Sequence, residues 1–196
     1  MHTSAYEQLA QFFRTLAEVP GSEIAKAMKI FQPVSLPKGA FLLRAGDIPL
    51  TLGFVVSGVI RLFFITPDGD EITRSFRTEN SFVSSYSALL LGEPSRLFLQ
   101  ALEPTSLLVT PYSAYQALTT GHLSWQIVDR KFAQQLFIRQ EQRECELLLD
   151  DAATRYKKFL VDYPGLEARV KQHHIASYLG ITPVTLSRIR SQLANS

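Results

Sequence analysis

Cysteine is almost absent from this sequence, since Cys145 is the only one in 196 residues. A single thiol excludes an intrachain disulfide, a four-cysteine zinc site and a four-cysteine iron–sulfur cluster within one chain. Hydrophobic runs long enough to span a bilayer are also missing, and residues 1–19 contain no charged leader followed by an apolar stretch. We therefore expect a folded cytoplasmic protein that does not contact a membrane.

Histidine is scarce too, and its positions do not favour metal chemistry. All four copies lie outside the part of the chain with a β pattern, at His2, His122, His173 and His174. None of them joins the two-histidine-plus-carboxylate set that a cupin-like or facial-triad iron site requires. Neither a nucleophile-elbow glycine pattern nor a phosphate-loop lysine motif is present. The sequence thus predicts no catalytic residue, no metal, no cofactor and no enzymatic activity.

What the sequence does contain is a pair of short helical patterns in residues 172–193. Ile175 and Leu179 are four residues apart and share one helix face, while Leu186 and Ile189 are three apart on the next helix. The two apolar faces can meet and form one small core. This spacing predicts two packed helices joined by a tight turn.

The residues between the two patterns suit a turn followed by a new helix. Gly180 can adopt the left-handed conformation that ends the first helix without a Cβ penalty. Thr182 is a favourable N-cap, and Pro183 fits the first helical position because its missing N–H has no helical partner there. Together these residues predict a helix-turn-helix, a motif that reads DNA.

The outward face of the second helix is polar and basic. In helix-turn-helix proteins the N-terminal part of this helix lies in the major groove, where arginine can pair with guanine, so we expect Arg188 to contact a base or a nearby phosphate. The predicted DNA-binding residues are Thr182, Pro183, Val184, Thr185, Ser187, Arg188, Arg190 and Ser191. The alternative is a structural helical hairpin with a solvated basic face.

Charge is distributed unevenly behind a net value of +2. From Ala152 onward there are seven lysines and arginines against two acidic residues, a local excess of five positive charges. Such a patch suits a polyanion, because neutralised phosphates release counterions. An acidic protein partner is the alternative explanation.

Short β-rich runs separated by turn residues occupy the region between Phe31 and Thr110. Several strands at this spacing suggest a sandwich or barrel. Pro67-Asp68-Gly69 predicts a hairpin, since proline presets the first turn angle and glycine accepts a positive φ. The predicted strands are 40–43, 53–56, 59–65, 71–76, 96–102 and 106–109.

Helical patterns flank this β region on both sides. The longest runs from Ser124 to Leu149 without proline or glycine, and its apolar surface is wide enough to cover the β domain on one side and a twin helix on the other. A homodimer is the favoured interpretation and a monomeric core helix is the alternative. Shorter helices are predicted at 4–16, 22–28 and 151–162, and Tyr163-Pro164-Gly165 is a predicted hinge.

A roll, a long helix and a C-terminal helix-turn-helix, in this order, resemble the Crp/Fnr family of bacterial transcription regulators. The roll half of the resemblance depends on residues 36–39, Gly46, 55–61, 67–69 and 101–103. The DNA half, which is more specific, depends on residues 175–182 and on Leu186-Ser187-Arg188.

The resemblance implies an α+β fold in three parts. Residues 1–122 would form an N-terminal antiparallel β-roll of the cyclic-nucleotide-binding, jelly-roll kind, 123–149 a long dimerisation helix, and 150–196 a helix-turn-helix domain. The implied function is that of a homodimeric, sequence-specific transcription regulator that binds double-stranded DNA and contacts RNA polymerase. The rival function is a cupin-like, ligand-binding β-roll module without DNA-directed activity, which would leave the capped basic helix unexplained.

Family members that bind cyclic nucleotides use a Gly-Glu pair for the ribose and an arginine for the cyclic phosphate. Alignment on Phe82 and Ala101 places Ser84 and Ser85 at the first pair and Ser95 at the arginine. Arg96 is displaced by one residue, which in a strand turns its side chain to the other face. We therefore expect that any effector is not cyclic AMP.

Two interpretations of the same segment remain open. It either lines a small polar pocket for an unidentified small-molecule effector or is packed and ligand-free. The candidate pocket residues are Ser84, Ser85, Tyr86, Ser87, Ser95 and Arg96.

Overall fold

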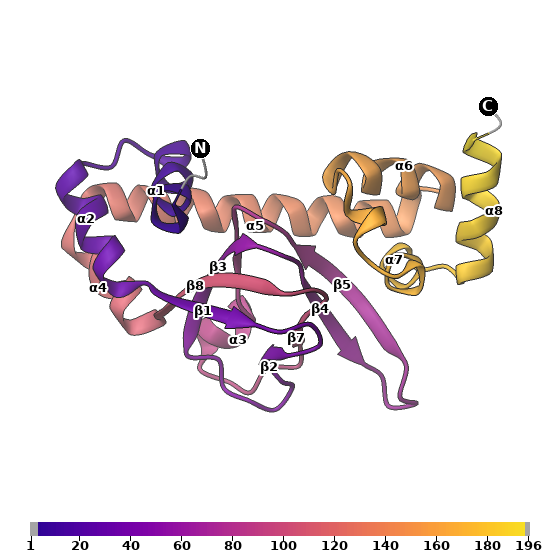
Figure 1. The fold of residues 1–196 in the computed structure, drawn as a ribbon, viewed down its shortest axis with the longest axis horizontal. Coiled ribbons are helices and arrows are strands. Elements are labelled where there is room, and N and C mark those ends of the chain that lie inside the picture. Colours follow the sequence, from indigo (N-terminus) through magenta and orange to yellow (C-terminus); the bar gives the residue numbers. More distant parts are fainter. Residues whose placement is uncertain (1–3, 195–196) are drawn as a thin grey trace. The chain divides into compact units, whose positions relative to one another are not determined.

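The computed structural model describes residues 4–194, so His2 lies outside the described part of the chain. Within that part the fold is α+β, with helices on either side of eight strands in the sequence (Figure 1). The first helix, α1 (Ala5–Leu16), begins where the Ser4 hydroxyl accepts the Glu7 N–H at 3.2 Å, as the predicted N-terminus requires. The second helix, α2, spans Gly21–Ile30.

The strands form two four-stranded sheets, with strand orders β1-β8-β3-β6 and β2-β7-β4-β5. Neighbouring strands in the first sheet run antiparallel, and Phe54 in β3 lies opposite Leu108 in β8 and Phe82 in β6. The predicted roll is therefore present. The strands are β1 (Gln32–Leu36), β2 (Phe41–Leu43), β3 (Thr51–Ser57), β4 (Ile60–Ile65), β5 (Glu71–Arg77), β6 (Ser81–Val83), β7 (Phe98–Ala101) and β8 (Thr105–Pro111).

Three elements of this region were not predicted from the sequence. They are β1, β6 and the six-residue helix α3 (Tyr86–Leu91). β1 contains Pro33, which lacks a donor for a ladder hydrogen bond, and the strand accordingly lies at the edge of its sheet. Gly92 ends α3 in the left-handed conformation (φ 67°), so Gly92-Glu93 is a turn, as predicted.

Glycine is required at the turn between β3 and β4. Gly58 has φ +101°, and a Cβ there would lie 2.4 Å from the Thr105 Oγ1. No L side chain fits this conformation or this space. The close approach brings the β3–β4 turn against the first residue of β8.

Aromatic side chains fill the core between the first sheet and the helices. The Phe82 ring lies 5.3 Å from Phe54 on β3 and 5.8 Å from Phe13 on α1. Phe13 in turn meets Trp125 edge-on at 4.8 Å. All four rings are buried. Edge-to-face packing adds to the burial of apolar area, so this cluster holds α1 and the start of the long helix on the sheet.

The predicted long helix is α5, which runs from Leu123 to Leu149 and follows α4 (Tyr112–Gly121). Without proline or glycine, nothing in its sequence interrupts the backbone ladder. No helix within residues 4–194 is long and apolar enough to cross a membrane.

The C-terminal part consists of short helices. α6 (Ala152–Asp162) begins where the Asp151 carboxylate accepts the Thr154 N–H at 2.7 Å. A turn at Gly165 (φ 74°) and the 3-10 helix η1 (Leu166–Ala168) lead to α7 (Gln172–Leu179) and α8 (Pro183–Ala194).

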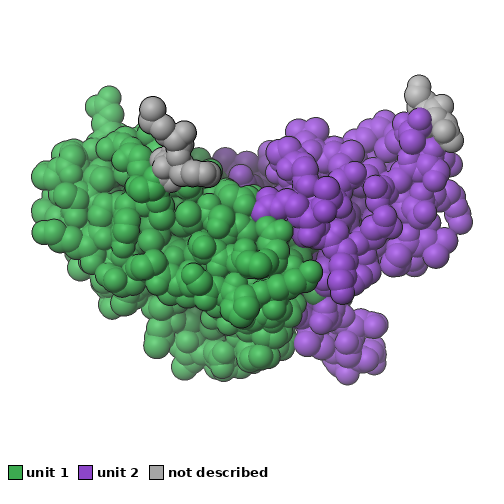
Figure 2. Space-filling model, viewed as in Figure 1, with its two compact units in different colours: residues 1–62, 76–136 green, residues 63–75, 137–196 purple. Residues whose placement is uncertain are grey.

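The chain divides into two compact units (Figure 2). The first contains residues 1–62 and 76–136, and the second contains residues 63–75 and 137–196. The second unit thus joins the tip of the β4–β5 hairpin to the C-terminal half of α5 and the helices that follow. The three-part functional division predicted from the sequence remains a prediction.

Candidate nucleic-acid interface and roll site

The turn between α7 and α8 has the geometry that its glycine predicts. Gly180 has φ 69° and ψ 34°. Its N–H donates to the Ser177 carbonyl at 3.2 Å, and the Ile181 N–H donates to the Ala176 carbonyl at 3.0 Å. These two bonds form a Schellman motif, which satisfies the last carbonyls of α7 and fixes the direction in which the chain leaves it.

The start of α8 is capped as predicted. The Thr182 Oγ1 accepts the Thr185 N–H at 3.2 Å, and the Thr182 and Thr185 hydroxyls lie 3.0 Å apart. Pro183 is the first residue of the helix, where a missing N–H costs nothing. The cap therefore determines which residues form the exposed N-terminal turn of α8.

The predicted apolar faces of α7 and α8 are buried against each other. Ile175, Leu179 and Leu186 are at most 1% exposed and Ile189 is 7% exposed. Ala176 is fully buried, because two helices that approach closely leave room only for a small side chain. The residues that satisfy the helix-turn-helix spacing in the sequence thus form one core.

The predicted DNA-binding residues lie on the opposite side of α8. Thr185 and Arg190 are half-buried at the flanks, and a 3.6 Å ion pair joins Arg190 to Glu167. Arg188 is exposed and has no side-chain partner among residues 4–194. The remaining five predicted residues are also exposed: Thr182, Pro183, Val184, Ser187 and Ser191.

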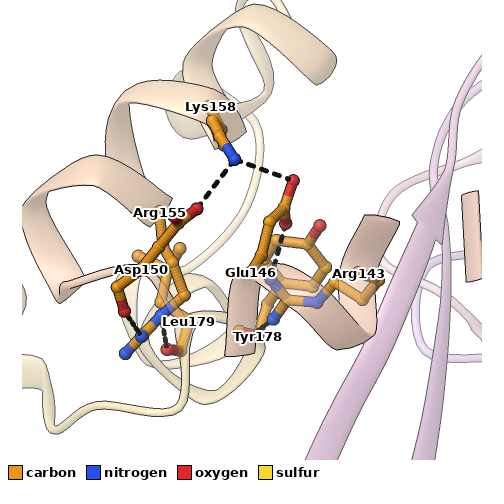
Figure 3. A network of polar contacts seen from close by, with 7 residues as sticks. All are labelled: Arg143, Glu146, Asp150, Arg155, Lys158, Tyr178 and Leu179. Atoms are coloured by element: carbon orange, nitrogen blue, oxygen red, sulfur yellow. Dashed lines mark hydrogen bonds and ion pairs between the residues drawn. The ribbon is translucent and has the colours of Figure 1, made fainter. Parts of the chain in front are cut away.

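Some of the basic residues after Ala152 bond to other groups of the protein. Arg155 donates through Nε to the Leu179 carbonyl at 3.0 Å and through a second nitrogen to the Asp150 carbonyl. Lys158 pairs with the Asp150 carboxylate at 2.7 Å and lies 3.9 Å from Glu146 (Figure 3). These cations support the end of α7 and the α5–α6 connection, so fewer basic side chains are available to a polyanion than the count suggests.

Arg143 on α5 is a supporting residue that the sequence did not single out. Its guanidinium lies 3.9 Å from the centre of the Tyr178 ring, donates to the Tyr178 carbonyl and pairs with Glu146 at 3.2 Å (Figure 3). A cation over an aromatic face is stabilising. The C-terminal end of α7 is therefore held by two arginines, one from α5 and one from α6.

Tyr178 belongs to an aromatic cluster beneath the helix pair. Its ring lies 5.7 Å from Phe159 and 5.7 Å from Tyr163. Burial raises the pKa of the Tyr178 phenol above its usual value, since a phenolate in this apolar cluster would lose its hydration. The neutral form of Tyr178 is therefore favoured in this cluster.

A contact that no sequence pattern indicated joins α7 to the β4–β5 hairpin within the second unit. The Ser177 hydroxyl accepts the Thr73 N–H at 2.9 Å and donates to the Glu71 carbonyl at 2.9 Å. Nearby, Arg74 donates to the Gln140 side chain at 2.9 Å. Burial is the main cause that lowers the pKa of Arg74. One hydroxyl thus bonds two backbone groups of β5.

In the roll, three of the six candidate effector residues form hydrogen bonds within the protein. The Ser95 Oγ donates to Ser85 Oγ at 2.9 Å or to the Leu97 carbonyl at 3.0 Å, and it accepts the Leu97 N–H at 2.9 Å. Both serines are buried. The Ser84 hydroxyl donates to the Thr51 carbonyl at 3.0 Å. Buried hydroxyls with internal partners have little hydrogen-bonding capacity left for a ligand.

The other three candidate residues point to different environments. Ser87 and Arg96 are exposed. Tyr86 is half-buried, with its ring 5.7 Å from Phe132 on α5. Burial, with a smaller contribution from the charge of Asp129, raises the pKa of Tyr86 to about 12. The six residues therefore do not share one environment, although Ser85 and Ser95 are in direct contact.

No group of three or more histidine, cysteine, aspartate or glutamate side chains that could hold a metal ion occurs within residues 4–194. The Nδ1 of His122 is used locally, since it accepts the Ser124 N–H at 3.1 Å at the start of α5. His173 and His174 lie in the first turn of α7, with ring centres 4.0 Å apart.

Known proteins share parts of this sequence and this arrangement of elements. Residues 33–122, which contain nearly all of the roll, match the cyclic nucleotide-binding domain. The sequence is also 25% identical over 193 residues to the fumarate and nitrate reduction regulatory protein of Vibrio cholerae, covering 93% of this chain and 76% of that one. The matched domain and this relative support the Crp/Fnr family of bacterial transcription regulators as the family of this chain.

Solved structures of Crp/Fnr proteins share the fold. The catabolite activator protein of Thermus thermophilus is 26% identical, with a TM-score of 0.58 over 91% of this chain and 85% of that one. FixK2 from Bradyrhizobium japonicum superposes with a TM-score of 0.72 over 85% of each chain at 21% identity. The predicted family and fold class are confirmed.

Proposed function

We propose that this protein is a homodimeric, sequence-specific DNA-binding transcription regulator of the cytoplasm that acts together with RNA polymerase. The observation that carries the proposal is the Thr182-capped helix α8, whose buried side completes the α7–α8 core while Arg188 lies exposed on the other side. A capped second helix with a basic outer face is what a major-groove reader needs. The fumarate and nitrate reduction regulatory protein of Vibrio cholerae, similar over 93% of this chain, supports the same conclusion.

Arg188 and Arg190 provide a matched pair for testing this function. Both are arginines on α8, but Arg188 is exposed without a partner among residues 4–194, whereas Arg190 is paired with Glu167 at the flank. Sites would first be selected from a random DNA pool, and affinities would then be measured on the selected site and on random DNA at one salt concentration.

Arg188→Ala is expected to weaken binding to the selected site by about tenfold to a hundredfold and to weaken random DNA much less, because a bidentate guanine contact discriminates by about 1–3 kcal/mol. Arg190→Ala is expected to weaken both DNAs equally, as a phosphate contact would. Equal losses of affinity for the selected site and for random DNA in Arg188→Ala would show that Arg188 contacts a phosphate and not a base. Failure to select any preferred sequence would contradict the proposed function.

Exposed apolar residues on α5 support the homodimer. Phe137 is 69% exposed, Ile138 is 50% exposed and Leu148 is 75% exposed. By helix periodicity, Phe137 and Leu148 lie opposite Val128 and Phe132, which pack into the roll core, and Ile138 lies at the flank. A second copy of α5 would cover them. Two paired helices would also set the separation of two recognition helices to about one turn of DNA.

The proposal also excludes one ligand of the roll. Any ligand of the roll is not cyclic AMP, because Ser85 and Ser95 occupy the positions of the ribose and phosphate contacts and bond each other. An effector event would act by changing the separation of the recognition helices. Calorimetry with cyclic AMP and cyclic GMP should give no binding heat at micromolar concentrations, and a micromolar dissociation constant for either nucleotide would overturn this assignment.

A further inference from the structure

Val184 is an apolar side chain of α8 that is exposed in the part of the chain that the structure describes. It is 68% exposed, whereas Leu186 and Ile189 on the same helix are buried. At about 100° per residue, Val184 lies nearly opposite the stripe formed by Leu186, Ile189 and Leu193. It therefore occupies the centre of the outward face of α8.

The polar neighbours of Val184 are already engaged locally. The Thr185 hydroxyl lies 3.0 Å from the Thr182 hydroxyl at the cap, and the Ser191 hydroxyl donates to the Ser187 carbonyl at 3.1 Å. Arg188, four residues after Val184, is the neighbour on this face with a charged group available for a base. The middle of the face therefore offers one branched apolar group beside one guanidinium.

The chemistry of the major groove leaves one apolar partner for such a group. Base edges there present hydrogen-bond donors and acceptors, and the thymine C5-methyl is the apolar exception. We propose that Val184 is a specificity-determining residue that contacts a thymine methyl in the DNA site. This inference rests on the proposed function, because it requires α8 to lie in a major groove.

The geometry of the helix also limits where that thymine lies. Val184 and Arg188 are separated by four residues, or about 6 Å along the helix axis at 1.5 Å per residue. Base pairs are spaced by about 3.4 Å. The thymine read by Val184 is therefore expected within about two base pairs of the guanine read by Arg188.

The test uses the full-length protein and removes only the methyl group. In the selected DNA site, each thymine is replaced singly by deoxyuridine, which lacks the C5-methyl and keeps the same hydrogen-bonding edge. Burial of one methyl or methylene group corresponds to about a fourfold change in affinity. We expect one thymine near the Arg188-dependent guanine to show this fourfold loss with the unmodified protein.

Variants then assign the loss to Val184. With Val184→Ala, the thymine and deoxyuridine sites are expected to bind equally, because the contacting side chain is gone. Val184 is exposed, so this substitution is expected to leave the circular dichroism spectrum and thermal unfolding unchanged. Ser191→Ala is the matched control on the same face, and with it the fourfold loss should persist.

The outcomes separate the inference from the proposed function. If no DNA sequence is selected, the proposed function fails. If a site is selected but every thymine tolerates deoxyuridine, the inference is overturned while the function stands. The inference is equally overturned if the deoxyuridine loss persists with Val184→Ala, because the methyl would then act through DNA shape rather than through Val184.

Discussion

Replacing Ser177 with alanine should loosen the contact between the β4–β5 hairpin and α7. The Ser177 hydroxyl makes two hydrogen bonds, one from the Thr73 N–H and one to the Glu71 carbonyl, each 2.9 Å long. A typical hydrogen bond contributes about 1 kcal/mol. Because Ser177 is half-buried, the two bonds together should contribute about 1–2 kcal/mol to keeping this contact closed.

That energy predicts a measurable change in local opening. A loss of about 1–2 kcal/mol raises the population of the open contact by a factor of about 5–30. Amide hydrogen exchange of Thr73 measures this opening directly, since its N–H is the donor to Ser177. Ser177→Ala should therefore speed exchange at Thr73 by about 5–30-fold, while amides in the roll core should be unaffected.

Ser187→Ala is the matched control, because Ser187 is an exposed serine on α8 and forms no hydrogen bond with β5 among the described residues. It should leave the exchange of the Thr73 amide unchanged. An unchanged rate in Ser177→Ala would refute the reasoning, since it would mean that the hydroxyl does not hold this edge of the strand. Equal acceleration by both variants would point to general destabilisation of the helix pair.

Three further perturbations follow from the structure. Burial raises the pKa of Tyr156 to about 12, so the folded state holds that proton more tightly than the unfolded chain, and the resulting stability should be full below pH 10 and lost between about pH 10 and 12. Tyr156→Phe should flatten that part of a curve of unfolding free energy against pH, and an unchanged slope would contradict the assignment. Phe137→Glu should weaken the dimer more than tenfold by light scattering, because burying a phenylalanine side chain is worth about 1.5–3 kcal/mol. Gln135→Glu places the same charge on the opposite side of α5, at an exposed residue, and should not weaken it; dimers of equal affinity in both variants would exclude the Phe137 face. Gly58→Ala should lower the midpoint of thermal unfolding steeply, since its Cβ would lie 2.4 Å from Thr105 Oγ1, and a shift of only a degree or two would show that the turn can rearrange.

The elements predicted well from the sequence are those whose signals are local. The helix Leu123–Leu149 begins one residue before its predicted start at Ser124 and ends at the predicted residue. A long run without proline or glycine has few alternatives to a helix. Gly180, Thr182 and Pro183 each adopt the expected conformation, since a left-handed turn and a helix cap depend on a few neighbouring residues.

The elements that were missed depend on partners far away in the sequence. β1 contains Pro33 and becomes a strand only because β8 pairs with it, and α3 is too short for a helical period to be recognised. Ser177 lies 104 residues from Thr73, so no local pattern could indicate their hydrogen bond. The positive charge of Arg155 and Lys158 was visible in the sequence, but its use inside the protein was not.

The serine at the outer edge of β5 also bears on solubility. β5 is the last strand of its sheet, and an unpaired strand edge is a template on which other extended chains can add. The Ser177 side chain takes the place of a neighbouring strand at Glu71 and Thr73. A molecule whose hairpin has separated from α7 therefore offers this edge to other molecules, and its tendency to aggregate should rise with the time it spends in that state.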